Sequence, residues 1–103
     1  MRLIVRSKTY VAQLKALLEQ GMLRFGSRVV DAKLAQVERT LEHFLAVHPD
    51  AKRADPHLGL HVYPNSRTPF VVLNDFDDRE LRVHFIFHRN ADLRDLDPKS
   101  AEW

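Results

Sequence analysis

One predicted strand late in the chain carries side chains that could act on a phosphodiester. In residues 81–88 every second position points the same way. One face would therefore carry Arg82, His84, Ile86 and His88, opposite the phenylalanines. Metal-free RNA cleavage needs a base for the 2′-hydroxyl, a cation for the phosphate and often an acid for the leaving oxygen. His61 and Tyr63 share a face of an earlier strand and could join this set. A solvated polar face of a half-buried sheet is the alternative that stays open.

Other kinds of chemistry have no support in the sequence. The chain has no cysteine, which excludes disulfides, thiol nucleophiles and thiolate metal ligands. His84 and His88 are four residues apart on a predicted strand, about 13 Å, which is too far for one metal ion. The glycines form no phosphate-binding loop, and the serines are expected at caps and in loops. We therefore expect neither a metal nor a cofactor.

Two helices are predicted to follow a short N-terminal strand. Residues 3–5 form an apolar run between arginines, and Ser7 or Thr9 can cap a helix after it. That helix is apolar on one face and is expected to stop at Gly21. A second helix is expected over residues 26–49, with helical spacing of Val30, Leu34, Val37, Leu41, Phe44 and Leu45. The two helices would form an αα-hairpin.

The second half of the chain is predicted to fold as strands. After Pro56 the apolar period changes from 3.6 to 2, which indicates strands at residues 58–63, 70–76 and 81–88. Two prolines place residues 64–69 in a loop, and residues 77–80 form a polar turn. The order β-α-α-β-β-β predicts an α+β fold with a largely antiparallel sheet packed against the αα-hairpin. At 103 residues, the chain is expected to be a single domain, residues 1–103.

Charge is distributed unevenly along the chain. The formal net charge is +2, but residues 1–53 hold ten basic and five acidic side chains, and residues 54–103 hold six basic and nine acidic ones. The predicted hairpin carries most of the positive charge, at Lys8, Lys15, Arg24, Arg28, Lys33 and Arg39. No apolar run approaches the ~18–20 residues of a membrane span, and residues 1–6 do not form a signal peptide. We therefore expect a cytoplasmic protein with no membrane partner.

Three stretches of the chain are similar to a known family. They are residues 11–14 in the first predicted helix, residues 41–49 with the letters LAVHP, and residues 70–93, where Asp92 follows His88. With the order of elements, they resemble the RelE/ParE superfamily over nearly the whole chain, without one specific motif. This chain departs from the family at two points. Residues 89–91 (Arg-Asn-Ala) stand where basic residues are common, and the arginine nearest the 70–76 strand is Arg67.

The resemblance implies a toxin of a bacterial type II toxin–antitoxin module. ParE-like members poison DNA gyrase, whereas RelE-like members cleave mRNA in the ribosome through a basic sheet face. The acidic second half of this chain and its lack of a basic C-terminal cluster favour the gyrase inhibitor. Two alternatives stay open. One is a metal-independent, ribosome-dependent endonuclease acting through Arg82, His84 and His88, and the other is a non-toxic module that only binds a partner.

The resemblance also implies a cognate antitoxin. A sheet flanked by a helical hairpin leaves a groove and an open edge, which an amphipathic segment can fill by helix packing or strand addition. The apolar residues that the predicted core does not use mark this contact: Val11, Leu23, Val71, Leu73 and Ile86. Arg28 belongs to the basic hairpin, where an electropositive patch would favour docking to a protein or a DNA-bound enzyme. The sequence leaves a homodimer open.

Overall fold

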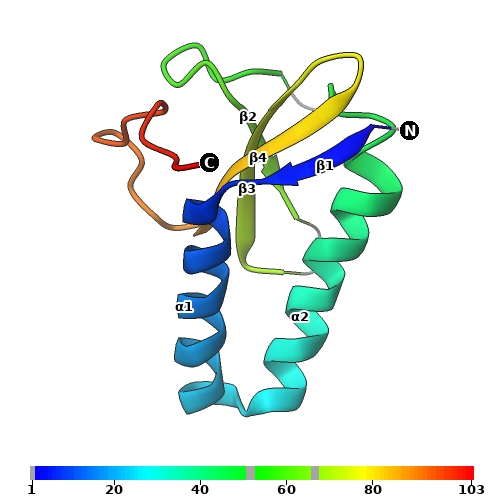
Figure 1. The fold of residues 1–103 in the computed structure, drawn as a ribbon. Coiled ribbons are helices and arrows are strands. Elements are labelled where there is room, and N and C mark those ends of the chain that lie inside the picture. Colours follow the sequence, from blue (N-terminus) through cyan, green and yellow to red (C-terminus); the bar gives the residue numbers. More distant parts are fainter. Residues whose placement is uncertain (1, 51–52, 66–67) are drawn as a thin grey trace.

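The strands form one mixed sheet, and the helical hairpin packs on one of its faces (Figure 1). This computed structural model describes residues 2–50, 53–65 and 68–103, without the side chains of residues 22–25, 27 and 30. In chain order the elements are β1 (Leu3–Arg6), α1 (Lys8–Phe25), α2 (Ser27–Thr40), the π-helical turn η1 (Leu41–Leu45), β2 (His61–Pro64), β3 (Phe70–Phe76) and β4 (Glu80–His88). The predicted order and the α+β class are confirmed.

The first helix begins at a serine cap and ends at a glycine. The Ser7 hydroxyl oxygen accepts a hydrogen bond from the Tyr10 N–H at 2.8 Å and donates one to the His84 carbonyl at 2.7 Å. This ties the start of α1 to the sheet. The predicted stop at Gly21 is wrong, because a glycine inside a helix costs only about 1 kcal/mol. The positive φ of 81° that ends the helix occurs five residues later, at Gly26.

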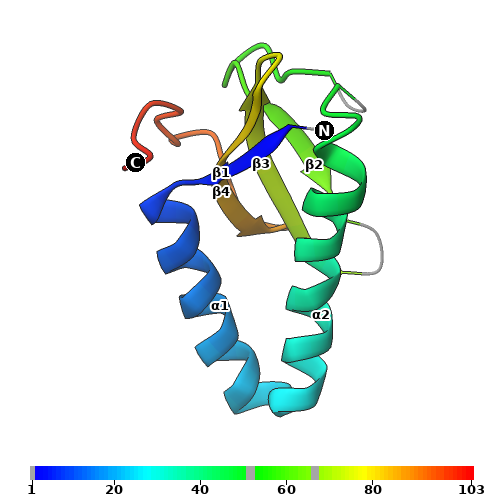
Figure 2. The same ribbon diagram turned by 45° about the vertical axis from the view of Figure 1, so that its right-hand side comes forward.

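The second helix returns the chain to the sheet and ends in a π-helical turn. The α-helix ends at Thr40 and the π-helical turn at Leu45, before the predicted end at Pro49, and the Ala46 N–H donates to the Leu41 carbonyl at 3.0 Å. Leu41 and Leu45 are both buried against the sheet. Figures 1 and 2 show that the end of the hairpin where α1 meets α2 projects away from the sheet.

The strand order across the sheet is β1–β4–β3–β2. The β2–β3 and β3–β4 pairs are antiparallel, as predicted, whereas β1 pairs with β4 in parallel. The predicted strand at residues 58–63 begins only at His61, because Gly59 turns the chain with a φ of 70° and donates its N–H to the Asp55 carbonyl at 2.7 Å. Pro64 ends β2 instead of lying in the loop, which is tolerated because β2 is an edge strand.

A β-bulge interrupts the alternation of side chains along β4. Leu73 lies opposite Phe85, but the next residue, Asn74, lies opposite Val83. His84 is therefore an extra residue in β4, and the faces of the strand exchange at this point.

The bulge makes one prediction wrong, namely that Arg82, His84, Ile86 and His88 share a face. Ile86 is buried in the core beneath the hairpin, and His88 lies at a groove beside α1. Arg82 and His84 lie on the opposite face, where both contact Asp75.

Two cores occupy the two faces of the sheet. The first core lies between the hairpin and the sheet and contains the buried residues Tyr10, Val37, Leu41, Leu45, Val72, Leu81, Val83 and Ile86. The second core lies on the other face and contains Leu58, Leu60, Val71, Leu73 and Phe85. The central strands β3 and β4 are consequently buried on both sides.

Residues 89–103, here called the C-terminal strap, cover the second core. Leu93, Leu96 and Ala101 pack against it. The strap then reaches the start of α1, where the Lys8 N–H donates to the Glu102 carbonyl at 2.6 Å and the Glu102 N–H donates to Thr9 Oγ1 at 2.9 Å. We call the side of the sheet beneath these residues the strap face.

Candidate functional site

Arg82 lies on the strap face, held by three carboxylates. Its Nε is 2.8 Å from Asp75 Oδ1, and its Nη1 is 2.8 Å from Asp77 Oδ2 and 2.9 Å from Glu80 Oε1. The hydrogen bond to Asp77, followed by those to Glu80 and Asp75, raises the pKa of the guanidinium above its ordinary value. Three carboxylates outweigh one guanidinium, so this part of the sheet is electronegative and disfavours an RNA phosphate.

The same contacts lower the pKa of the Asp77 carboxyl. The hydrogen bond from Arg82, followed by those from the backbone amides of Arg79 and Glu80, brings it from 3.8 to about 2. Because the pKa is lower in the folded state, this interaction contributes to stability above the ordinary pKa of an aspartate. The contribution is lost as the pH falls toward about 2.

We expect an NMR titration of the side-chain carboxyl carbons to show the Asp77 midpoint near 2 in the wild type. In Arg82→Gln the midpoint should move up toward the ordinary aspartate value, because the largest cause of the shift is removed. Asp92 is the internal control, since its lowered pKa depends on Arg94 and should not respond to Arg82→Gln. An Asp77 midpoint that stays near 2 in the variant would assign the whole shift to the backbone amides.

His84 lies beside Arg82 and shares its carboxylate. The Nε2 atom is 3.1 Å from Asp75 Oδ1, the oxygen that also accepts from Arg82. The Nδ1 atom is buried and has no hydrogen-bond partner among the described residues. The ring of Trp103, in the strap, packs edge-on against the imidazole with the ring centroids 4.7 Å apart. Only 13% of the His84 side chain is exposed, which leaves little of it accessible to a substrate.

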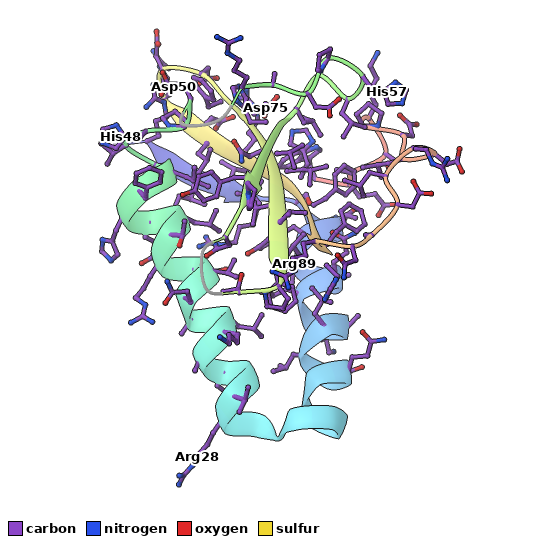
Figure 3. All side chains as sticks on the ribbon, turned by 180° about the vertical axis from the view of Figure 1, so that it is seen from behind. Arg28, His48, Asp50, His57, Asp75 and Arg89 are labelled. Carbon is purple, nitrogen blue, oxygen red and sulfur yellow. The ribbon has the colours of Figure 1, made fainter. Side chains whose placement is uncertain are left out.

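His88 lies on the opposite side of the sheet, at a groove between β4 and α1. The groove has a volume of about 490 Å³ and is lined by Gln13, Ala16, Leu17, Glu19, Gln20, Ile86, Phe87 and His88. In Figure 3, Asp75, which Arg82 and His84 contact, lies toward one end of the β3–β4 pair, and Arg89, the residue after His88, lies at the other. The structure therefore brings Arg82 and His84 together but does not bring His88 to them.

His61 and Tyr63, the other residues considered for this chemistry, face the hairpin side. Tyr63 packs against the first core. The His61 ring lies against Phe76, with the ring centroids 5.1 Å apart. Neither residue shares the strap face with Arg82 and His84.

The residues predicted to contact a partner differ in exposure. Val71, Leu73 and Ile86 are buried, so the prediction that the core does not use them is wrong. For Val71 and Leu73 the cause is the strap, which covers the second face of the sheet. For Ile86 the cause is the bulge, which turns its side chain into the first core. Val11 is 52% exposed on α1, and Figure 3 shows Arg28 pointing away from the hairpin at its far end. The side chain of Leu23 is outside the described residues.

One residue at the groove was not found from the sequence. The Oε1 atom of Gln13 accepts a hydrogen bond from the Ile86 N–H at 2.8 Å. A single glutamine within a helix gives no pattern that would indicate this role, because the contact depends on where β1 ends relative to β4.

Among the described residues, no helix combines the length and the apolar character that crossing a bilayer requires. The described part of the chain also contains no group of three histidine or carboxylate side chains arranged to hold a metal ion.

Comparison with known proteins identifies the fold. No family model matches the sequence, and no curated protein matches it either. Among solved structures, a chain from the "Chromosomal ParDE TA system from P. aeruginosa" is similar, with a TM-score of 0.74 and 16% sequence identity. The match covers 85% of this chain and 96% of that one. The resemblance to the RelE/ParE fold is thereby confirmed.

Proposed function

We propose that the chain is the toxin of a type II toxin–antitoxin pair, that it inhibits growth by poisoning DNA gyrase, and that a cognate antitoxin neutralises it. The toxin role is supported by the fold shared with a chain of a ParDE system. The choice of gyrase over the ribosome is carried by one observation: Arg82, the arginine of the nuclease set, is bound by Asp75, Asp77 and Glu80. A target in the cytoplasm would place the protein there.

The geometry gives no comparable support to RNA cleavage. A metal-free nuclease needs a base and a free cation within reach of one phosphate. Here Arg82 and His84 are occupied by Asp75, and His88 lies across the sheet. The remaining alternative, a non-toxic module that only binds a partner, is tested by the experiment described below.

The exposed face of the hairpin is the surface that we assign to the target. Among the described side chains of α1 and α2, the exposed charges are the basic Lys8, Lys15, Arg28 and Arg39 against the acidic Glu19 and Asp31. An electropositive surface accelerates association with an electronegative partner and orients it. Arg28, at the projecting end of the hairpin, is placed to make the first contact, and Val11 offers an exposed apolar contact on α1.

Inducing the wild-type chain alone in bacteria should arrest growth, induce the SOS response and trap gyrase on cleaved DNA. Arg28→Glu reverses a charge at the surface that we assign to gyrase, so it should weaken binding about tenfold or more, which is about 1.4 kcal/mol, and thereby raise the viable counts on induction. Arg82→Gln is the matched control, since Arg82 is also an arginine but lies on the strap face, and its toxicity should be unchanged.

The other outcomes of this experiment identify the alternatives. Arrested translation with cleaved mRNA, abolished by Arg82→Gln, would contradict gyrase poisoning and favour the endonuclease. Normal growth on induction of a soluble, folded chain would leave only the non-toxic binding module.

A further inference from the structure

The last residues of the strap lie where the start of α1 meets the sheet. In Figure 1 the red end of the chain lies beside the first turn of α1 and beside β4. The Glu102 carbonyl accepts from the Lys8 N–H at 2.6 Å, and the Glu102 N–H donates to Thr9 Oγ1 at 2.9 Å. The first N–H groups of a helix have no partner within the helix. The end of the strap therefore supplies an acceptor that the first turn of α1 lacks.

The next strap residue, Trp103, packs against the imidazole of His84. The two rings meet edge-on, at an angle of 88°, and the Nδ1 atom of His84 is buried without a hydrogen-bond partner among the described residues. The Nε2 atom is 3.1 Å from Asp75 Oδ1, the oxygen that also accepts from Arg82. Because a carboxylate only accepts, Nε2 carries the proton of the neutral ring and Nδ1 holds a lone pair.

A second proton on His84 changes the cost of keeping the strap in place. Protonation converts Nδ1 from an acceptor into an N–H donor, and a buried donor without an acceptor is unfavourable. Where Trp103 moves away from the ring, water reaches Nδ1 and satisfies the donor. The imidazolium is therefore more stable when the end of the strap is released than when it is docked. By linkage, protonation favours the released state.

The charged groups around the imidazole do not reverse this direction. Asp75 and Arg82 belong to the sheet, as do the other two carboxylates that Arg82 binds. They stay in place when the strap moves, so their effect on the proton is common to both states. The strap and α1 bring Glu102 and Lys8 to this junction. Both side chains are exposed to solvent, which screens their charges.

We propose that the contacts of Glu102 and Trp103 with α1 and the sheet form a latch that opens when His84 is protonated. The latch is closed above the range in which histidines titrate and opens as the pH falls from about 8 to about 5. Leu93 and Leu96 keep the rest of the strap on the second core. Opening therefore frees the Lys8 N–H and exposes His84 without unfolding the sheet. The proposal does not depend on the proposed function.

Amide hydrogen exchange of the full chain, followed by NMR, tests the latch. Between about pH 8 and about pH 5, the protection of the Glu102 and Lys8 amides should fall about ten- to hundredfold after correction for the intrinsic pH dependence of exchange. This factor corresponds to the burial of one unpaired donor. His84→Gln, which is neutral at every pH, should give equal protection at both values. His57→Gln is the matched control. The exposed His57 ring also contacts the strap, 3.4 Å from the Arg94 carbonyl, so the wild-type response to pH should remain.

The amides of Val72 and Leu81, in the central strands, are the internal control and should keep their protection at the lower pH. If they lost it together with Glu102, acid would be unfolding the whole domain and the latch would be ruled out. Equal protection of Glu102 at both pH values in the wild type would overturn the proposal as well. A pH response that persists in His84→Gln would do the same, because another group would then take up the proton.

Trp103→Ala provides a second variant that leaves His84 in place, for the case that His84→Gln does not fold. The Glu102 amide should then be weakly protected at both pH values, because the ring that covers the imidazole is gone. Strong protection of Glu102 at the higher pH in this variant would show that Trp103 does not hold the end of the strap, and the latch would be rejected.

Discussion

Phe85→Ala is expected to lower the free energy of unfolding by about 3–5 kcal/mol, which is a large part of the total for a domain of this size. Phe85 is only 1% exposed and is the single aromatic residue among the buried members of the second core. Its ring also stacks on Phe87, with the centroids 5.7 Å apart. Removing it opens a cavity between the sheet and the strap, which cannot collapse fully because both sides are held by backbone hydrogen bonds.

Urea denaturation measures this loss, and Trp103 is the only tryptophan in the chain, so its fluorescence reports on the strap directly. Phe85→Leu is the matched control and should cost clearly less, because most of the buried volume remains. If Phe85→Ala cost less than about 1 kcal/mol, the second core would contribute little and the strap would be loosely held.

Tyr10→Ala is expected to have an effect of similar size, about 3–5 kcal/mol, through the first core. Tyr10 is fully buried where α1, α2 and the sheet meet. Its hydroxyl donates to Glu38 Oε1 at 3.0 Å, and the other oxygen of Glu38 accepts from Arg6. Burial, followed by the charge of Glu38, raises the pKa of the Tyr10 hydroxyl well above its ordinary value, so it remains a donor across the accessible pH range.

Tyr10→Phe separates the ring from its hydroxyl and should cost about 1.5–3 kcal/mol, because the hydroxyl donates to a charged carboxylate. A double-mutant cycle of Tyr10→Phe with Glu38→Gln, read by urea denaturation, gives the coupling between the two groups. If Tyr10→Phe cost as much as Tyr10→Ala, the hydrogen bond to Glu38 and not the buried ring would hold the hairpin on the sheet.

The order and kind of elements could be predicted because each depends on nearby residues. The helical spacing of Leu34, Val37 and Leu41 and the alternation of Leu81 and Val83 both point to the core that these residues form. A serine before α1 and a glycine after it mark the ends of that helix. What could not be predicted at Gly21 and Gly26 is which of two glycines takes the positive φ, since both are compatible with a helix end.

The candidate site was only partly predictable because of the bulge at His84. A period of two assigns every residue of a strand to a face, but one extra residue exchanges the faces of everything after it. No residue type within residues 80–88 indicates the bulge, which is defined only by the pairing of β4 with β3. The prediction therefore placed His88 with Arg82 and His84, on the wrong side.

The packing of the strap against the sheet could not be predicted from the sequence pattern either. Residues 89–103 are mostly polar, and Leu93, Leu96 and Ala101 follow neither a helical nor a strand period. Their burial depends on the apolar face that Leu73 and Phe85 present to them. Without the strap, one core cannot use all the apolar residues of β3, so the sequence pattern alone assigns Val71 and Leu73 to a partner.

The parallel pairing of β1 with β4 determines the point during synthesis at which the sheet can close. Ser7 and His84, whose hydrogen bond closes this junction, are 77 residues apart in the chain. The helical hairpin depends on local contacts and can form while the chain is still emerging from the ribosome, whereas β1 has no neighbour until β4 has been made. An interrupted translation product would therefore contain the hairpin without a closed sheet beneath it. Only a chain synthesised through its last strand can adopt the complete fold.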